Sequence, residues 1–262
     1  MDIFKDKVAV ITGAANGIGK ALSLQCAKAG MKVILADRDQ DSLDRCKKEL
    51  RVINKNIICV VTDVTKSADL ARLAQTTLNN YDQVHFLFNN AGISGELGPF
   101  WEQPIVDIEK VIQTNLMEIL YGMRIFTPIM LSQNSDCYII NTAAGGGLLT
   151  GPSLAAYKTS KHAAVALSEV VAADLAALNA KINVSIIIPH LIKTNIIEQI
   201  KNCSPAEKEK LNEIYETAML PGELANIVFE GITSKKFYIF SHFEIHAPKI
   251  RQRMENILNG HF

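Results

Sequence analysis

The fold of this 262-residue chain is decided by one stretch near its start, Lys7-Val8-Ala9-Val10-Ile11-Thr12-Gly13-Ala14-Ala15-Asn16-Gly17-Ile18-Gly19. Its first half is a short apolar run that ends in a glycine, which is typical of a strand buried on both faces. An Ala- and Leu-rich amphipathic stretch follows to about Ala29. A strand, a glycine turn and a helix in this order predict a site for a pyrophosphate. The glycines lack a Cβ, so the backbone can approach the phosphates, and the helix N-terminus offers unpaired N–H groups.

Apolar segments recur along the rest of the chain and alternate with helical patterns. Further strands are predicted at 32–37, 56–64, 84–89, 136–142, 182–188 and 237–240, and helices at 39–51, 67–81, 107–132, 153–178, 221–232 and 249–258. Strands and helices that alternate through short connections predict a parallel sheet covered by helices on both faces. We therefore expect one α/β domain over residues 1–262, without a second domain.

The second predicted strand ends on a carboxylate, Asp37, which lies within about 20 residues of the glycine turn. A carboxylate at this place can bind the ribose hydroxyls of an adenosine and repel a 2′-phosphate. The alternative is an acid that only begins the next helix. Arg38 follows directly and can accommodate a phosphate, so NAD is favoured over NADP without NADP being excluded.

Tyr157 and Lys161 lie four residues apart in a predicted helix, which places both side chains on one face. An ammonium group stabilises a phenolate, so Lys161 is expected to lower the pKa of Tyr157 from about 10 toward the range of a general base. Because isolated pairs with this spacing occur by chance, the chemical interpretation depends on the other motifs.

Composition excludes several other classes of protein. The 27 basic and 27 acidic residues give no net charge, so neither nucleic acid nor an anionic membrane is an expected partner. The five cysteines are scattered without metal-ligand spacing, and His85 is predicted to be structural, so no metal site is expected. No charged and apolar leader opens the sequence, and no apolar run reaches the roughly 18 residues of a membrane span. These features predict a soluble, cytoplasmic protein with reduced cysteines.

The motif Asn89-Asn90-Ala91-Gly92 closes the fourth predicted strand. Together with T-G-x-x-x-G-x-G at 12–19 and Y-x-x-x-K at 157–161, it makes the chain resemble the short-chain dehydrogenase/reductase family. The resemblance runs from Lys7 to about Asn195 and continues more loosely to the end. It implies a Rossmann-type doubly wound parallel sheet of about seven strands, a nicotinamide dinucleotide, and hydride exchange between an alcohol and a carbonyl. It also implies a homodimer or homotetramer, with the helices at 107–132 and 153–178 in the dimer contact.

The resemblance assigns roles to single residues. Tyr157 would be the acid/base, and Lys161 would bind the nicotinamide ribose. Asn115 would hold a relay water through its backbone or side chain, whereas the residues alone suggest a polar side chain on a solvated face. The residues implied to bind the cofactor are Gly13, Asn16, Gly17, Ile18, Gly19, Asp37, Arg38, Asp63, Val64, Asn90, Ala91, Gly92, Tyr157, Lys161, Pro189, Ile192 and Thr194.

One position departs from the family pattern. Family members carry a serine thirteen residues before the tyrosine, which here is Ala144. That serine donates a hydrogen bond to the substrate oxygen, and losing such a donor costs on the order of a hundred- to a thousand-fold in rate. Thr142, Thr150 or Ser153 could supply another hydroxyl. The alternative function is an impaired dinucleotide-binding sensor or scaffold, although the retained tyrosine and lysine favour an enzyme.

Residues 195–220 correspond to the variable substrate lid of the family. The apolar residues Ile196, Ile197, Ile200, Leu211, Ile214, Tyr215 and Met219 suggest a hydrophobic substrate, but they would serve equally to dock the lid. His190 stands where related sequences often have glycine, and it is either a pocket residue or an ordinary loop residue. Residues 241–262 form a C-terminal extension.

Overall fold

The computed structural model describes residues 3–196, 200 and 202–261. In this part of the chain seven strands form one sheet in the order β3-β2-β1-β4-β5-β6-β7, and every pair is parallel. The strands are β1 (Val8–Thr12), β2 (Lys32–Asp37), β3 (Ile57–Val61), β4 (Phe86–Asn89), β5 (Cys137–Thr142), β6 (Ile182–Ile188) and β7 (Tyr238–Phe240). The order reverses between β1 and β4, as in doubly wound dinucleotide-binding folds. The predicted fold class is therefore confirmed.

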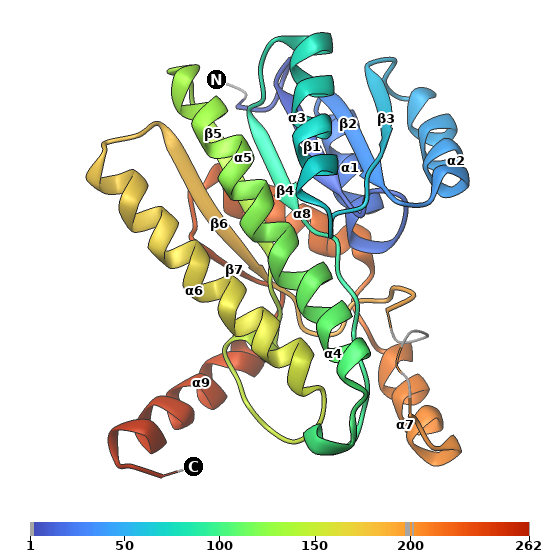
Figure 1. Cartoon of the computed structure of the whole chain (residues 1–262), viewed down its shortest axis with the longest axis vertical. Helices are drawn as coiled ribbons and strands as arrows, with labels where there is room; N and C mark the ends of the chain where they lie inside the picture. The colour runs from blue at the N-terminus through green and yellow to red at the C-terminus, as the bar shows by residue number, and fades with distance from the viewer. Residues whose placement is uncertain (1–2, 197–199, 201, 262) are drawn as a thin grey trace.

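Helices cover both faces of this sheet (Figure 1). One face carries α1 (Gly17–Lys28), α2 (Gln40–Arg51) and α8 (Pro221–Thr233), and the other carries α3 (Ser67–Tyr81), α5 (Glu118–Ser132) and α6 (Ala155–Ala177). The remaining helices are α4 (Ile105–Ile112), α7 (Pro205–Glu216) and α9 (Phe243–Leu258). In Figure 1, α4, α7 and α9 lie toward the end of the molecule where the strands finish, and α9 projects from the body.

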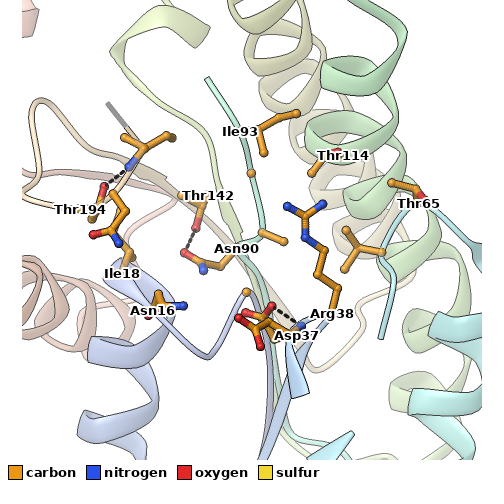
Figure 2. A pocket seen from close by; sticks show the side chains of 18 of the residues that line it. Asn16, Ile18, Asp37, Arg38, Thr65, Asn90, Ile93, Thr114, Thr142 and Thr194 are labelled. Carbon is orange, nitrogen blue, oxygen red and sulfur yellow. Dashed lines mark hydrogen bonds between the residues drawn. The ribbon is translucent and has the colours of Figure 1, made fainter. Parts of the chain in front are cut away.

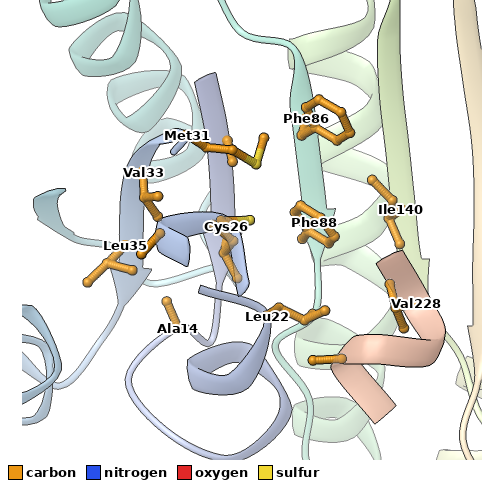
Figure 3. Packing of buried hydrophobic residues seen from close by; sticks show 14 of the residues in the cluster. Ala14, Leu22, Cys26, Met31, Val33, Leu35, Phe86, Phe88, Ile140 and Val228 are labelled. Atoms are coloured by element: carbon orange, nitrogen blue, oxygen red, sulfur yellow. The ribbon is translucent and has the colours of Figure 1, made fainter. Parts of the chain in front are cut away.

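The core on the α1 and α8 face is built around the central strand β4 (Figure 3). Phe86 and Phe88 are fully buried, and the Phe86 ring stacks on Tyr138 with 4.6 Å between centroids. Leu22 of α1 and Val228 of α8 close over the same strand. Burying one such side chain contributes about 1.5–3 kcal/mol, so this layer fixes the strand ends that carry the site.

The helix expected over 107–132 is instead two helices, α4 and α5, joined by a π-helical turn over Gln113–Met117. Asn115 lies at the centre of this turn. It is fully buried, and its amide bonds both the N–H and the carbonyl of Ile93 at 2.8 and 2.9 Å. The expectation of a solvated face at this position was therefore wrong. Single π turns of this kind occur frequently at functional sites.

The last helix begins at Phe243 and not at 249, so Pro248 lies inside it. Its first turns are anchored by His246, which is buried against Gly145, and this contact places the start of the helix before the proline.

His85 proves structural, as predicted. Its Nδ1 accepts the Val8 N–H at 3.2 Å, and burial lowers the pKa of its ring to about 4. Among the described residues there is no group of three side chains placed to hold a metal ion. Within the same residues, no helix has the length and apolar character needed to cross a membrane.

Candidate active site

A cavity of about 320 Å³ opens at the carboxyl ends of β1 and β4, where the strand order reverses (Figure 2). It brings together most of the predicted cofactor residues: Gly13, Asn16, Gly17, Ile18, Asp37, Arg38, Asp63, Val64, Asn90, Ala91, Gly92, Tyr157, Lys161, Pro189 and Thr194. It also includes residues that were not predicted to bind the cofactor: Asp39, Thr62, Thr65, Ile93, Thr114, Thr142, Ala143, Asn195 and Ile196. Gly19, Asn115 and Ile192 lie outside the lining.

The glycine turn is shaped by backbone conformation and by close packing. Gly13 and Gly17 have φ angles of +59° and +52°, a region that favours glycine. A Cβ on Gly19 would lie 2.0 Å from the Gly13 carbonyl oxygen, so Gly19 lets α1 pack onto the turn and does not face the cavity. A Cβ on Gly17 would lie 3.0 Å from Cγ2 of Thr194, so the segment that follows β6 reaches the turn.

Polar side chains tie the ends of the central strands together behind the cavity. The Thr12 hydroxyl accepts the Asn90 N–H at 2.9 Å, and the Asn90 amide donates to the Thr12 carbonyl at 3.0 Å. Thr142 at the end of β5 donates to Asn90 Oδ1 at 3.3 Å (Figure 2). These bonds hold the glycine turn in register with the Asn89–Gly92 segment.

Asp37 lies at the edge of the cavity beside Arg38 (Figure 2). Its two carboxylate oxygens accept the N–H groups of Ala15 and Asp39, each at 3.2 Å. Further along the lining, a hydrogen bond from the Thr65 hydroxyl holds the pKa of Asp63 below its usual range. The edge of the cavity therefore presents a fixed carboxylate and an exposed guanidinium next to each other.

These features fit a dinucleotide. A turn without Cβ atoms, the N-terminus of α1 and a carboxylate at the end of β2 line one continuous cavity, as the pyrophosphate and ribose of such a molecule require.

Tyr157 and Lys161 project from α6 into the same cavity. Lys161 Nζ donates to the Thr142 carbonyl at 2.8 Å and lies 5.8 Å from the centroid of the Tyr157 ring. Burial raises the pKa of Tyr157 to about 12 and lowers the pKa of Lys161. This differs from the expected lowering of the tyrosine pKa, because in the ligand-free protein the loss of solvation of the phenolate outweighs the attraction of the ammonium group.

Asn115 lies behind this pair. Besides bonding Ile93, its amide donates to the Ser160 hydroxyl at 3.2 Å, so both amide hydrogens are engaged. A Cβ on Gly92 would lie 3.4 Å from Asn115 Oδ1 and 3.6 Å from Lys161 Nζ. Asn115 and Lys161 therefore flank Gly92, and the oxygen is the part of the Asn115 side chain that still has a free lone pair.

Ala144 is buried and extended at the end of β5, and its carbonyl accepts the Gly147 N–H at 2.8 Å. Of the three hydroxyls considered as substitutes, Thr142 lines the cavity but donates to Asn90. Ser153 accepts the Gly98 N–H at 3.1 Å, and Thr150 is exposed. Thr142 therefore uses its hydrogen on Asn90, Thr150 faces solvent, and Ser153 acts as an acceptor toward Gly98.

Three histidines gather beside Gly145. His190 is exposed, and its ring lies edge-on to His242 and His246 at 5.7 and 5.2 Å between centroids. A Cβ on Gly145 would lie 2.3 Å from His246 Nε2, so the glycine makes room for this ring. No sequence pattern signals the contact, because it joins residues a hundred positions apart.

The lid is docked by the Tyr215 side chain and by backbone hydrogen bonds. The Tyr215 hydroxyl bonds the backbone of Thr194, and the Met219 N–H donates to the Leu191 carbonyl at 3.1 Å. Ile192, predicted at the cofactor, is buried in the core and pairs with Met219 in an isolated bridge. Ile196 faces the cavity, whereas Ile197 lies outside the described residues.

Known proteins share this architecture. Residues 7–204 match the short chain dehydrogenase family model. The chain is 31% identical to a CLA biosynthesis dehydrogenase/reductase of Lactiplantibacillus plantarum, covering 98% of this chain and 95% of that protein. It is also 31% identical to a 1-deoxy-11-beta-hydroxypentalenate dehydrogenase of Streptomyces exfoliatus, with 96% and 88% covered.

Among solved structures, a short chain dehydrogenase/reductase from Burkholderia phymatum in complex with NAD superposes with a TM-score of 0.92. The two are 36% identical, and the match covers 99% of this chain and 96% of that one. These similarities support dehydrogenase activity and the binding of a nicotinamide dinucleotide. Together with the glycine turn and the tyrosine–lysine pair in one cavity, they show that the chain belongs to the short-chain dehydrogenase family.

Proposed function

We propose that this protein is an NAD-dependent oxidoreductase that interconverts a secondary alcohol and its ketone. One observation carries the proposal: a single cavity is lined by the glycine turn of a dinucleotide site and by the Tyr157–Lys161 pair. A protein that only binds dinucleotide has no need for a buried phenol and ammonium group beside the nucleotide.

The chain's own residues supply proton transfer and orientation. When bound, the nicotinamide supplies the acceptor or donor of hydride. Tyr157 donates its proton to the ketone oxygen in reduction and removes the hydroxyl proton in oxidation. Because its pKa of about 12 keeps it protonated near neutral pH, the ligand-free site is prepared for reduction. Lys161 orients the ribose and stabilises the phenolate once it forms. Asn115 holds a relay water through its backbone carbonyl or its side-chain oxygen.

NAD is the proposed cofactor. The Asp37 carboxylate is held at the cavity edge by two backbone N–H groups, so it cannot turn away easily from an added 2′-phosphate. Arg38 supports the opposite preference, but it is exposed and long, and ordering it costs more side-chain entropy.

We also propose that activity is reduced by Ala144. The position leaves the developing charge on the substrate oxygen without a hydroxyl donor, while the cofactor residues are complete. The competing function, a dinucleotide-dependent sensor or scaffold with little turnover, rests on this same residue.

The proposed substrate has a hydrophobic body. Ile93 and Ile196 line the same cavity as Tyr157, which supports this class. The relative from Streptomyces exfoliatus is named for a hydroxylated substrate, which supports an alcohol as the reacting group.

A homodimer or homotetramer in the cytoplasm completes the proposal. Leu120, Leu131, Val170 and Leu178 are exposed on or beside α5 and α6, the helices expected to form the dimer contact. Light scattering coupled to size exclusion tests the assembly.

A panel of secondary alcohols and ketones, assayed with each of the four nicotinamide nucleotides, tests the function. The panel is run on this chain and on Ala144→Ser. Turnover with NAD or NADH that is lost in Tyr157→Phe supports the proposal. Tight NADH binding without turnover in either chain supports a sensor or scaffold.

A further inference from the structure

Glu118 is a completely buried carboxylate that the sequence analysis did not select. It is the first residue of α5, directly after the π turn. Its Oε1 accepts a hydrogen bond from the Thr12 hydroxyl and one from the Ala91 N–H at 3.1 Å. Its Oε2 has no hydrogen-bond partner among the described residues. A buried acid with one free oxygen at the back of the site calls for an explanation, because an isolated buried charge is costly.

The opposite charge is supplied by Lys161, which is only 3% exposed. Its hydrogen bond to the neutral Thr142 carbonyl does not balance the charge of its ammonium group. The two charges are separated by a thin layer of backbone: the Ala91 N–H bonds Glu118, and a Cβ on the next residue, Gly92, would lie 3.6 Å from Lys161 Nζ. No ion pair within 4.0 Å joins them in the part of the chain described, so they act through space.

Glu118 can be ionised or protonated without moving, because the Thr12 hydroxyl can either donate to it or accept from it. The Thr12 hydroxyl has one hydrogen and two acceptors, Glu118 Oε1 and the Phe88 carbonyl at 3.1 Å. When Glu118 is ionised, the hydroxyl donates to it. When Glu118 is protonated, the acid donates to Thr12, whose hydroxyl turns to Phe88.

We propose that Glu118 is a positioning residue whose carboxylate holds Lys161 in its cationic form from behind the Asn90–Gly92 backbone. The role given to Lys161 rests on the proposed function, but the charge coupling itself does not. The other ionisable side chains that line the cavity with Lys161 are Tyr157 on the same helix, the carboxylates of Asp37, Asp39 and Asp63, and the guanidinium of Arg38. Among the described residues, no ion pair joins Lys161 to any of these carboxylates.

The directions in which the pKa values of Glu118 and Lys161 shift agree with this geometry. Burial raises the pKa of Glu118 and lowers that of Lys161, and their mutual attraction opposes both shifts. Removing the negative charge therefore leaves only the effect of burial on the lysine. An opposite charge at short range moves a pKa by about one to three units, so a shift of about one pH unit is expected.

The test uses the full chain without ligand, with the lysine side chains labelled with ¹⁵N and the Lys161 signal assigned from Lys161→Arg. In Glu118→Gln, which keeps the shape but not the charge, the midpoint of the Lys161 titration falls by about one pH unit. In Glu118→Asp, which keeps the charge, the midpoint stays closer to that of the parent. Ser168→Ala is the matched control, since Ser168 is also fully buried on α6 but bonds Asn141 and Ala164.

A second measurement is the pH profile of kcat for any substrate that turns over. Loss of the counter-charge moves the alkaline limb of this profile to lower pH in Glu118→Gln, and Ser168→Ala leaves it in place. An unchanged Lys161 midpoint in a folded Glu118→Gln protein overturns the proposal, whether or not a substrate has been found. If Glu118→Gln does not fold, Thr12→Val replaces it, because removing the hydroxyl that donates to Glu118 should shift the midpoint in the same direction. An unchanged midpoint in Thr12→Val is then the overturning result.

Discussion

The dinucleotide half and the substrate half of the cavity are built in different ways. The dinucleotide half comes from short contiguous motifs at the ends of β1, β2 and β4, and its main features are backbone conformation and one fixed carboxylate. The substrate half comes from segments far apart in the chain. Ile93 comes from the segment after β4, and Ile196 comes from the segment after β6. Its expected serine is also missing.

This difference shows which part of such a site local sequence specifies. A positive φ or a missing Cβ is a property of one residue, so a motif encodes it directly. A pocket wall made by the start of the lid and by the segment after β4 depends on how distant elements pack. The following changes test whether the two halves can be perturbed separately.

The largest difference between the effect on turnover and the effect on NADH binding is expected for Tyr157→Phe. Removing the hydroxyl removes the proton donor, which lowers kcat by about 10²- to 10⁴-fold, while the ring is kept and NADH affinity stays nearly the same. Stopped-flow turnover and calorimetric titration of NADH measure the two effects. Lys161→Ala is the comparison variant, because it should weaken both turnover and NADH binding. Turnover equal to that of the parent in Tyr157→Phe would remove the tyrosine from the mechanism.

Ala144→Ser should restore the missing donor in the substrate half. The gain in kcat approaches about a hundred-fold, or about 2.7 kcal/mol of barrier, because the donor acts on charge that grows toward the transition state. The substrate KM and the NADH affinity should change little. Thr150→Ala is the control, since Thr150 is exposed and close in sequence. If the serine adds nothing to an active parent, another hydroxyl has replaced it, and Ser153→Ala should then be the damaging change.

The sequence was sufficient for the fold and for most of the dinucleotide half. The predicted bounds of β2 and β6 are those of the structure, because buried parallel strands appear as continuous apolar runs between turns. The helix over 107–132 was predicted as continuous, since nothing local shows that Asn115 would bond Ile93 across the site. Glu118 was missed for a related reason: a glutamate in a helix has no local mark that it will be buried.

Gly19→Ala tests the backbone character of the dinucleotide half. The added Cβ would lie 2.0 Å from the Gly13 carbonyl oxygen, so the turn must move, and NADH affinity should fall by about tenfold or more. Gly222→Ala in α8 is the matched control, because a Cβ there meets no atom within 4 Å. It should leave NADH binding intact and stabilise the helix by up to about 1 kcal/mol. Calorimetry and thermal unfolding distinguish the two. Equal NADH affinity in both variants would mean that the turn tolerates a Cβ.

The smallest expected effect concerns the choice between the two dinucleotides. Asp37→Asn keeps oxygen and nitrogen atoms at the ribose position but removes the negative charge, so NADPH binding should strengthen and NADH binding should weaken. The ratio of the two affinities should move toward NADPH by about tenfold, the size of one hydrogen bond to a charged group. Asp63→Asn changes a second carboxylate of the same cavity, and it should alter both affinities equally because that residue is expected at the adenine. Arg38→Ala completes the set. If Arg38 and not Asp37 decides the preference, the parent already binds NADPH as tightly as NADH, and Arg38→Ala is the change that moves the ratio. In that case the exposed Arg38 side chain governs the selection, and the fixed carboxylate does not.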